Sequence, residues 1–393
     1  MAKTLAILGA TGSIGIQALD VVSRHPDAFE LDALSARTNL DALADLARRH
    51  RPRTVVVPDG EAAIEIEPLL PQGTKVLHGP DALAEAAGSA DVVLNAIVGF
   101  AGVPATLAAL EAGRRLALAN KESLVVAAPL VEVARATPGA VVLPVDSEHC
   151  AIHQCLAGVS GAEPMRAVRR LILTASGGPF RGMQADELAT VTVDDALAHP
   201  TWRMGAKVTV DSSTLMNKGL EVLEAAALFS VPIDSVDVVV HPQSIVHSMV
   251  EFVDGSTIAQ LSHPDMRLPI AYALGYPERF DDGFGRISFD EALELTFEPP
   301  DAAAFRCLSL AYEAGRLGGT APAWLNAADE CAVEAFLSGR IAWRDIAGVV
   351  ESTLARFDGA SCSDVETLLM ADANARRVAS GIIDRMDSSV AVP

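Results

Sequence analysis

The sequence predicts an α/β protein made of more than one domain. In the first third of the chain, short apolar stretches with the length of buried strands alternate with helical patterns. A glycine-rich turn follows the first of these strands, and the chain from residue 302 onward has helical periodicity without strand signals. Half of the 393 residues are hydrophobic, so the chain can bury two or three separate cores.

The beginning of the chain is typical of a dinucleotide-binding fold. Residues 4–8 form a short apolar strand, GATGSIG follows at 9–15, and a helix is expected over about 14–23. Glycines permit a tight turn and a close approach of the backbone to a ligand, and the helix N-terminus attracts a pyrophosphate. The alternation predicts a Rossmann-like nucleotide-binding domain over residues 1–149. Its further strands are expected at 31–34, 54–57, 91–96, 116–119 and 140–145.

The end of the second strand indicates which nicotinamide dinucleotide this fold would accept. ALSARTN at 33–39 has no carboxylate that could bind a ribose 2′-hydroxyl, and Arg37 lies close to that position. Because an arginine suits a 2′-phosphate, NADP is favoured over NAD. An ordinary exposed arginine is the alternative interpretation.

Two carboxylates are expected at the carboxyl end of the last of these strands. PVDSEH at 144–149 places Asp146 and Glu148 two residues apart, and side chains two apart on a strand point the same way. Together with Glu221 they would make an all-oxygen site that suits Mg²⁺ or Mn²⁺ rather than zinc. The alternative is a helix N-cap at Ser147 with acidic residues around the first turn.

A polar junction between a strand and a helix is predicted at residues 207–221, KVTVDSSTLMNKGLE. The alternating start indicates a strand at 207–210, a helix is expected over about 214–229, and Asp211 or Ser212 would cap it. Three polar side chains share one face of that helix, namely Asn217, Lys218 and Glu221. Since unpaired N–H groups at a helix N-terminus favour an anion, the hydroxyls there and the nearby lysine predict a phosphate site. A solvated face with a Lys–Glu pair is the alternative.

Two loops that contain glycine add to the predicted site. TASGGPF at 174–180 follows an apolar strand, and its paired glycines expose backbone N–H groups beside Ser176, which suits a phosphate. HPTWRMG at 199–205 carries Trp202 between a proline and a glycine, which is typical of a lid that excludes water from a bound substrate. A loop anchored by a buried tryptophan is the alternative.

The charge balance and the apolar segments exclude several classes of partner. Thirty basic residues against 51 acidic ones give a formal net charge of −21, which disfavours nucleic acid and anionic membrane surfaces. The nearly apolar segment 92–110 is divided by asparagine, glycine and proline, so no membrane span is expected, and the N-terminus does not resemble a signal peptide. The five cysteines are odd in number and form no CxxC motif, which favours a reducing, cytoplasmic compartment.

The last two thirds of the chain predict two more domains. Residues 150–275 are expected to form a central α+β domain for catalysis and dimerisation, since the last strand leaves an edge suited to pairing between subunits. Residues 276–300 are rich in Pro, Gly and Asp and predict a linker, and four helical patterns predict a C-terminal α-helical domain at 301–393. The central strands are expected at 235–240, 246–252 and 257–261.

Seven motifs, in this order along the chain, resemble the 1-deoxy-D-xylulose 5-phosphate reductoisomerase family. They are GATGSIG, NKESLV at 120–125, PVDSEH, LTASGGPF, HPTWRMG, VDSSTLMNKGLE and HPQSIVHSM at 241–249. The resemblance covers nearly the whole chain. It implies a homodimeric, NADPH-dependent and metal-assisted enzyme of the non-mevalonate isoprenoid pathway. Such an enzyme rearranges 1-deoxy-D-xylulose 5-phosphate to an aldehyde and reduces it to 2-C-methyl-D-erythritol 4-phosphate.

The resemblance also implies roles for individual residues. The metal ligands would be Asp146, Glu148 and Glu221. The substrate phosphate would be held by Ser176, Ser212, Asn217 and Lys218, with His247 as a weaker candidate. The substrate near the metal would contact Lys121, Ser147, Glu148, His199 and Glu221. The catalytic group would comprise Lys121, Glu148, His199, Trp202 and Glu221. The cofactor would be bound by Thr11, Gly12, Ser13, Ile14, Arg37, Asn39, Asn120, Glu122 and Gly205.

The chain departs from the family pattern after the second strand and after PVDSE. Residues 37–39 are Arg-Thr-Asn where the family usually has Gly, a basic residue and Asn, so either Arg37 or Thr38 could hold the 2′-phosphate. Cys150 and His153 stand where the family tends to have Ser and Phe, which would alter packing only.

Two other functions fit part of the sequence. One is a different NADP-dependent dehydrogenase, for example of an amino-acid semialdehyde, but no cysteine is well placed beside a histidine to act as its nucleophile. The other is a redox sensor that binds NADP(H) without turnover. Such a sensor needs no set of three carboxylates, so both alternatives leave part of the pattern unexplained.

Overall fold

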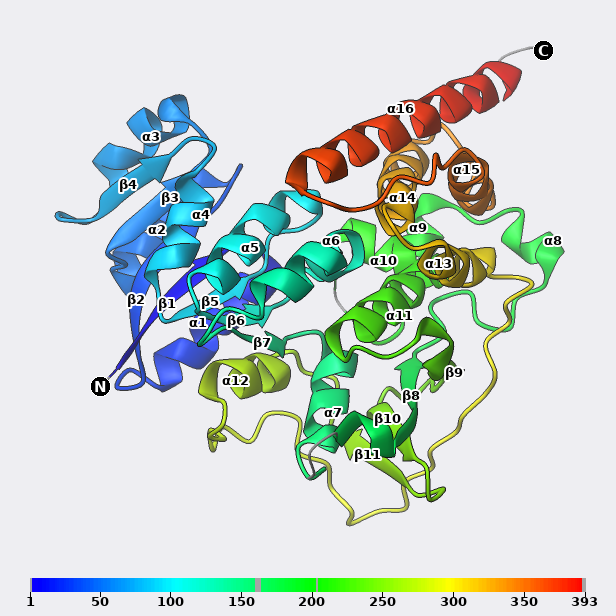
Figure 1. The fold of residues 1–393 in the computed structure, drawn as a ribbon, viewed down its shortest axis with the longest axis horizontal. Coiled ribbons are helices and arrows are strands. Elements are labelled where there is room, and N and C mark those ends of the chain that lie inside the picture. The colour runs from blue at the N-terminus through cyan, green and yellow to red at the C-terminus, as the bar shows by residue number, and fades with distance from the viewer. Residues whose placement is uncertain (1, 160–163, 203, 391–393) are drawn as a thin grey trace. The chain divides into compact units, whose positions relative to one another are not determined.

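The structure is a computed structural model that describes residues 2–159, 164–202 and 204–390 (Figure 1). Its residues form two compact units, and each unit contains one sheet. The first unit comprises Met1–Ser123, Pro129–Cys150 and Asp265–Gly285. The second comprises Leu124–Ala128, Ala151–Pro264 and Arg286–Pro393.

A seven-stranded parallel sheet forms the centre of the first unit. Its strands are β1 (Lys3–Leu8), β2 (Phe29–Ser35), β3 (Thr54–Val57), β4 (Lys75–His78), β5 (Val92–Asn95), β6 (Arg115–Leu118) and β7 (Val141–Pro144). They pair in the order β4-β3-β2-β1-β5-β6-β7. The order reverses beside β1, and sheets of this kind bind ligands at the carboxyl ends of the strands near that point. The predicted Rossmann-like sheet is confirmed, with β4 as a short, half-exposed strand that the sequence did not indicate.

Helices cover this sheet and complete its core. They are α1 (Ser13–Arg24), α2 (Leu40–His50), α3 (Gly60–Ile66), α4 (Ala82–Ser89), α5 (Val103–Glu111), α6 (Lys121–Ala134) and α12 (Arg267–Gly275). The boundary predicted at residue 275 would include α12 in the central domain. This helix packs against α1 instead, and its Ile270 is fully buried in the core of the first unit.

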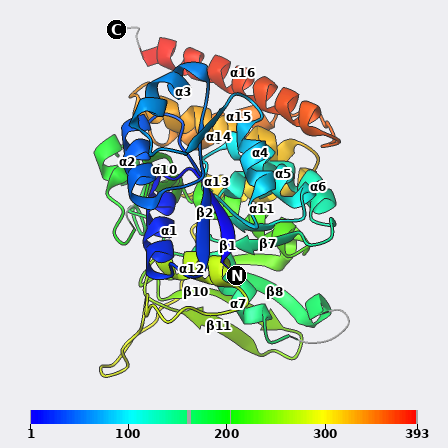
Figure 2. The same cartoon turned by 90° about the vertical axis from the view of Figure 1, so that its left-hand side faces the viewer.

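The second unit is built around a mixed four-stranded sheet. Its strands are β8 (Val168–Ala175), β9 (Val236–Val240), β10 (Val246–Phe252) and β11 (Thr257–Leu261). The order is β11-β10-β8-β9, with β9 parallel to β8 and the other pairs antiparallel. Figure 2 shows β10 and β11 running side by side. The predicted α+β character of the central region is confirmed.

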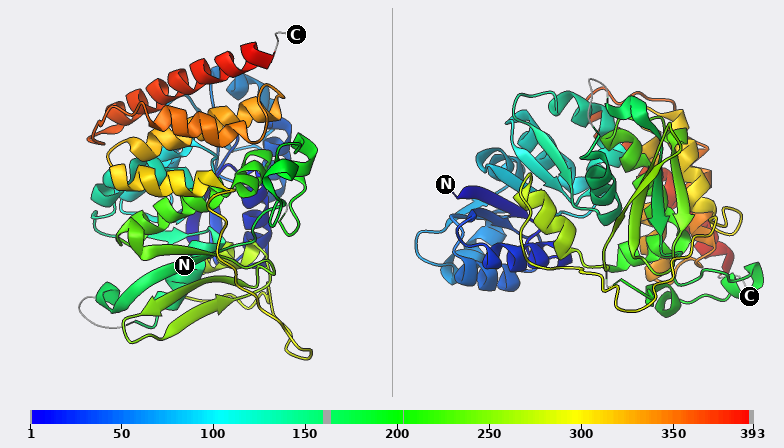
Figure 3. Two further views of the ribbon diagram at one scale, coloured as in Figure 1. Left: turned by 90° about the vertical axis from the view of Figure 1, so that its right-hand side faces the viewer. Right: turned by 90° about the horizontal axis from the view of Figure 1, so that it is seen from below.

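The C-terminal part of the second unit is helical, as predicted. Its helices are α13 (Arg306–Leu317), α14 (Ala321–Leu337), α15 (Asp345–Leu354) and α16 (Val365–Val390). Figure 3 shows them from yellow to red, and α14 contacts the other three. Further helices lie along the chain between β7 and β9, namely α7 (Ser147–Leu156), α8 (Ala185–Leu188), α9 (Val193–Leu197), α10 (Ala206–Thr214) and α11 (Met216–Leu228).

The predicted strand at 207–210 is wrong. These residues lie in α10, which ends at Leu215 in a left-handed conformation (φ 60°), and α11 starts directly after it. The Lys-Val-Thr-Val alternation favours a strand locally, but burial of one face of α10 and a bond from Thr209 Oγ1 to the Gly205 carbonyl favour the helix. Asp211 and Ser212 are therefore not N-caps but belong to the last turns of α10.

Asp146 and Glu148 do not lie on one strand, so this prediction is also wrong. Strand β7 ends at Pro144, and Glu148 is in the first turn of α7. The backbone N–H of Glu148 donates to Asp146 Oδ1 at 3.1 Å, so Asp146 caps α7. The alternative interpretation, a helix N-cap, was thus correct, but the capping residue is Asp146 and not Ser147.

Between α12 and α13 the chain has no helix or regular strand among residues 276–305, all of which are described. It is held to the second unit where Glu298 forms an isolated bridge with Val240. The division into four domains stays a prediction. Within the described residues, no helix combines the length and the apolar character that a membrane crossing requires.

Candidate active site

The glycine turn, residues 9–15, is shaped by close backbone contacts in the first unit. Gly9 has φ +86°, and a Cβ there would lie 2.6 Å from the Ala96 carbonyl oxygen. A Cβ on Gly15 would lie 2.5 Å from the Gly9 carbonyl oxygen, so neither position accepts a side chain. Gly12 caps α1 without a side-chain bond, and the first turn of α1 has no acidic residue. This leaves a bare helix N-terminus of the kind that binds phosphate.

The side chains after the second strand have separate local roles. Ser35 Oγ accepts a bond from the Gly9 amide at 2.9 Å, so this buried serine fixes the start of the glycine turn. Sequence reasoning missed Ser35. Its position at the end of β2, the strand that pairs with β1 before the glycine turn, was the signal that could have identified it. Asn39 caps α2 by accepting from the Ala42 amide at 3.1 Å, while Arg37 is exposed.

Asn120 and Glu122 form a buried network rather than an open face. The Asn120 amide donates to the carbonyl oxygens of Ile97 and Gly99 at 2.8 and 2.9 Å. Glu122 accepts from the Gly99 amide at 3.0 Å and from Asn120 at 2.9 Å. Both side chains therefore fix the loop after β5, beside the glycine turn, and their predicted contact with the cofactor stays a prediction.

Two carboxylates of the first unit, Asp146 and Glu148, lie close together, and a lysine side chain pairs with one of them. Ligand oxygens of Asp146 and Glu148 are within 4.8 Å of each other. Lys121 Nζ lies 3.0 Å from Asp146 Oδ2, and the fully buried His149 ring places Nδ1 2.8 Å from Oδ1 of the same carboxylate. Ser147 donates to Glu148 at 2.6 Å. Asp146 and Glu148 thus converge as predicted, although by a helix cap rather than by strand alternation, and the buried His149 ring lies against Asp146.

In the second unit, the start of α11 carries the predicted polar face. Lys218 is 3% exposed and Glu221 is 1% exposed, so the solvated-face alternative is wrong. Lys218 contacts Glu221, and the Asn217 amide donates to the same carboxylate at 2.5 Å. Gly219 allows α11 to approach α13, because a Cβ there would lie 2.7 Å from the Ala311 Cβ. The break before Met216 puts Asn217 and Lys218 in the first turn of α11, where the helix dipole favours an anion.

His199 joins the loop of the second unit that carries Ser176. Its Nδ1 accepts from the backbone amides of Thr201 and Trp202 at 3.1 and 2.9 Å, so the proton resides on Nε2. Nε2 then donates to Ser176 Oγ at 3.0 Å. Burial lowers the pKa of His199, which favours this neutral form.

The loop after β8 lies against the end of α10. Gly178 has φ +67°, and a Cβ there would lie 2.6 Å from the Ser212 carbonyl oxygen. This close approach brings Ser176 and Ser212 to neighbouring backbone segments. We call the set Ser176, His199, Ser212, Asn217 and Lys218 the polar corner.

The predicted lid residues lie beside the polar corner. Trp202 is half-buried, and its ring stands edge-on to that of the buried His247, with 6.2 Å between centroids. Gly205 is exposed and caps α10 through its carbonyl oxygen. The neighbouring Arg203 lies outside the described residues. The geometry fits either a lid or an anchored loop, and the lid stays a prediction.

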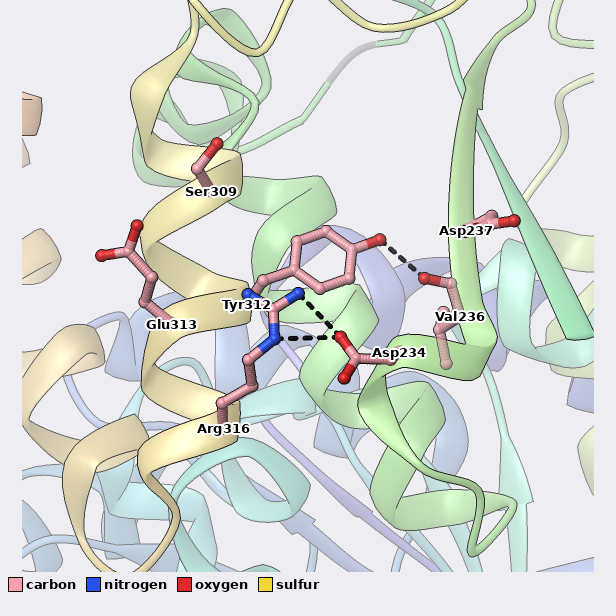
Figure 4. A pocket seen from close by; sticks show the side chains of 7 residues that line it. All are labelled: Asp234, Val236, Asp237, Ser309, Tyr312, Glu313 and Arg316. Carbon is pink, nitrogen blue, oxygen red and sulfur yellow. Dashed lines mark hydrogen bonds and ion pairs between the residues drawn. The ribbon is translucent and has the colours of Figure 1, made fainter.

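A pocket elsewhere in the second unit, between η4 (Ile233–Ser235) with β9 and α13, has its charges already paired (Figure 4). Arg316 bonds Asp234 at 2.7 Å, and the Tyr312 hydroxyl donates to the Val236 carbonyl oxygen at 2.6 Å. Arg170 bonds Asp237 at 2.6 Å. None of the predicted site residues lines this pocket.

Comparisons with known proteins decide the family. The sequence profile of 1-deoxy-D-xylulose 5-phosphate reductoisomerase matches residues 5–128. The profile of that enzyme's C-terminal domain matches 142–229, and that of the DXP reductoisomerase C-terminal domain matches 261–378. The 1-deoxy-D-xylulose 5-phosphate reductoisomerase of Xanthomonas campestris pv. campestris (strain B100) is 51% identical over 384 residues, covering 95% of each chain. The chain belongs to the 1-deoxy-D-xylulose 5-phosphate reductoisomerase family.

Further members of this family match over nearly their whole length. The 1-deoxy-D-xylulose 5-phosphate reductoisomerase of Methylococcus capsulatus is 50% identical, with 97% of this chain and 99% of that one covered. The solved structure of the Zymomonas mobilis enzyme in complex with NADPH superposes with a TM-score of 0.90 at 43% identity, covering 98% and 99% of the chains. A DOX-P reductoisomerase in complex with NADPH, fosmidomycin and magnesium gives 0.91 at 41% identity, covering 97% and 98%.

Proposed function

We propose that this chain catalyses the reaction of its family, the NADPH-dependent conversion of 1-deoxy-D-xylulose 5-phosphate to 2-C-methyl-D-erythritol 4-phosphate. The observation that carries the proposal is the pairing of two kinds of site in one chain. The glycine turn suits a dinucleotide, and the polar corner suits the phosphate of a small substrate.

The chemistry of the donor set fits a divalent ion held by Asp146, Glu148 and Glu221. All three are carboxylates, which Mg²⁺ and Mn²⁺ prefer as hard oxygen ligands. Without a metal, ammonium groups compensate two of these carboxylates, since Lys121 pairs with Asp146 and Lys218 with Glu221. A bound ion supplies a Lewis acid that polarises the carbonyl and an adjacent hydroxyl of the substrate. A relative solved with magnesium supports a divalent metal ion as the cofactor, whereas the three ligands are our proposal.

Residues of the polar corner position the substrate phosphate. Ser176 and Ser212 offer hydroxyl groups, Asn217 an amide, and Lys218 a buried ammonium group at the N-terminus of α11. Neutral His199 offers its Nε2–H beside Ser176. Because this binding energy comes from a part of the substrate that does not react, it helps to orient the reacting carbons.

Groups next to the carboxylates contact the reacting end of the substrate. Lys121 and Ser147 bond Asp146 and Glu148, and they can exchange these contacts for substrate hydroxyl groups. Trp202, on the loop that His199 begins, covers the carbon chain and excludes water.

NADPH is the reductant, and the glycine turn binds its pyrophosphate through Thr11, Gly12, Ser13 and Ile14. Arg37 or Thr38 holds the 2′-phosphate, and Asn39, Asn120, Glu122 and Gly205 complete the cofactor site. The relative solved with NADPH supports this cofactor. A thiol-dependent dehydrogenase is disfavoured, since burial raises the pKa of Cys155 to about 11 and also raises that of Cys307.

The working form is a cytoplasmic homodimer in this proposal. In the described part of the second unit, β11 is an edge strand that pairs with β10 alone, and Ile258 and Leu261 on it are exposed. Free cysteines at all five positions support a reducing compartment. Analytical ultracentrifugation of the purified chain tests the dimer, and a monomer at micromolar concentration would contradict it.

The proposed reaction is tested by following NADPH oxidation with the purified chain. Oxidation is expected only when 1-deoxy-D-xylulose 5-phosphate and Mg²⁺ or Mn²⁺ are both present. A chelator should abolish it, and an excess of the metal should restore it. Oxidation that is independent of metal, or that requires a semialdehyde substrate, would overturn the proposal.

A further inference from the structure

Trp343, in the short connection between α14 and α15, reaches the end of α10. It is 6% exposed, and its indole Nε1 donates to Ser213 Oγ at 2.8 Å. Ser213 is fully buried and donates its own hydroxyl to the Val210 carbonyl oxygen at 2.6 Å. The serine therefore accepts from the C-terminal helical region and donates within α10, beside Ser212.

The same indole ring also packs against the loop that carries Ser176. Phe180 is 3% exposed, and its ring stands edge-on to Trp343, with 5.2 Å between centroids and an interplanar angle of 86°. Phe305 makes a second edge contact at 6.2 Å on the ring of Trp343. Edge-to-face pairs at these distances are stabilising and directional.

The side chain of Trp343 contacts two segments that belong to different elements, the loop after β8 and the end of α10. One segment, from Ser176 to Phe180, approaches Ser212 so closely at Gly178 that a Cβ would not fit. The other segment is the last turn of α10. The approach brings the two backbones together, and the indole bonds one segment and packs on the other.

We propose that Trp343 is a positioning residue for the substrate phosphate, which fixes the spacing of the Ser176 loop and the Ser212 turn through Ser213 and Phe180. This inference rests on the proposed function, because it assumes that the polar corner binds the phosphate of the substrate. Trp343 itself does not touch the substrate. Its contribution is to keep the hydroxyl groups of the corner preorganised, so that little ordering is left for the moment of binding.

The decisive variant is Trp343→Phe, which keeps an aromatic ring and removes the N–H donor. A matched control is Trp324→Phe on α14. Trp324 is 3% exposed and packs edge-on to Phe357, but its Nε1 has no hydrogen-bond partner among the described residues. Both variants therefore remove the same group from a buried site, and only one of them breaks a bond to the polar corner.

Trp343→Phe is expected to raise KM for the sugar phosphate about three- to tenfold, the range of one hydrogen bond, with KM for NADPH unchanged. Trp324→Phe should change neither constant. If Trp343→Phe lowers the melting temperature while KM for the sugar phosphate matches wild type, Trp343 is only a packing residue and the inference is overturned. An equal rise in both KM values would also overturn it.

A double-mutant cycle with Ser213→Ala tests the route of the effect. If the indole acts through Ser213, the double variant should bind the sugar phosphate about as weakly as Ser213→Ala alone. If KM for the sugar phosphate in the double variant rises by the product of the two single-variant factors, Trp343 does not act through this hydroxyl.

Protection by inorganic phosphate separates this inference from the proposed reaction, because it needs no turnover. Phosphate should raise the melting temperature of wild type and of Trp324→Phe. At each phosphate concentration, the rise should be smaller for Trp343→Phe. Such a pattern without turnover in wild type would uphold the role of Trp343 and refute the reaction. Equal protection of all three proteins would refute the role of Trp343.

Discussion

The glycine turn of the first unit and the polar corner of the second are both proposed to hold a phosphate, and they would do so with different parts of the chain. In the glycine turn, backbone N–H groups and the absence of side chains make the site, and contiguous residues supply it. In the polar corner, side chains from three separate segments make the site, and buried tertiary contacts hold them. Backbone sites follow from local sequence, whereas side-chain sites depend on packing between distant segments.

Removal of a carboxylate from the proposed metal set should have the largest effect. Asp146→Asn, Glu148→Gln and Glu221→Gln should each lower metal-dependent turnover at least about a hundredfold, because each removes charge that holds the Lewis acid. NADPH affinity should stay close to wild type, since these side chains lie outside the glycine turn. Turnover assays and cofactor titrations measure both quantities. Glu132→Gln on α6 changes an exposed carboxylate and is the control, and near-normal turnover in any of the three variants would remove that residue from the set.

A methyl group in the glycine turn should affect the cofactor alone. Gly15→Ala is expected to weaken NADPH binding about ten- to hundredfold, because its Cβ would meet the Gly9 carbonyl oxygen at 2.5 Å and displace the turn. Gly88→Ala on α4 is the control, as its Cβ would meet only the Ala112 Cβ at 3.9 Å. Fluorescence titration with NADPH compares the two. Unchanged affinity in Gly15→Ala would mean that the cofactor binds elsewhere.

A change at the polar corner should affect the other substrate. Lys218→Met keeps the buried stem and removes the ammonium group, a charged hydrogen bond worth about 1.5–3 kcal/mol, so KM for the sugar phosphate should rise about tenfold or more. KM for NADPH should remain near the wild-type value. Steady-state kinetics with each substrate varied in turn tests this. A rise in the NADPH constant alone would reverse the assignment of the two regions.

Trp202→Ala distinguishes a lid from an anchor. As a lid, Trp202 stabilises the closed complex, so kcat/KM should fall about tenfold while the ligand-free melting temperature changes little. As a packed anchor, its truncation would cost about 3–5 kcal/mol of stability. Thermal unfolding without ligand, measured beside the kinetics, separates these outcomes.

The smallest effect concerns two buried carboxylates, Asp211 and Asp329, the first of which lies in α10 next to Ser212. Asp211 and Asp329 are both nearly inaccessible and share Lys207, whose Nζ lies 2.9 Å from Asp329 Oδ2. Burial, and then repulsion from Asp329, raises the pKa of Asp211 well above its ordinary value of 3.8. The folded state therefore retains a proton that the unfolded state loses, so stability falls as pH rises above about 4.

Asp211→Asn removes this titration. The melting temperature of the variant relative to wild type should increase by a few degrees between about pH 4.5 and 7. Melting curves across that range measure the difference. A constant difference would show that Asp211 is ionised throughout, with Lys207 as its full counter-charge.

Sequence reasoning predicted most of the first unit, and the roles of the proposed site residues stay predictions. The period of the strands and the glycines of the turn are local signals, and the structure follows them to within one or two residues at most strand ends. The error at 207–210 arose because Lys-Val-Thr-Val fits a strand locally, while the burial that makes it helical comes from other parts of the second unit. Ser35 and Trp343 were missed for the same reason, because their partners become visible only after folding.

The central claim is that one chain both rearranges the sugar phosphate and reduces it with hydride from NADPH. The most direct measurement incubates the enzyme with 1-deoxy-D-xylulose 5-phosphate, Mg²⁺ and NADPH that carries deuterium at the transferable position of the nicotinamide. Mass spectrometry should then find 2-C-methyl-D-erythritol 4-phosphate with one deuterium. Product without deuterium, or unchanged sugar phosphate beside oxidised cofactor, would contradict the account.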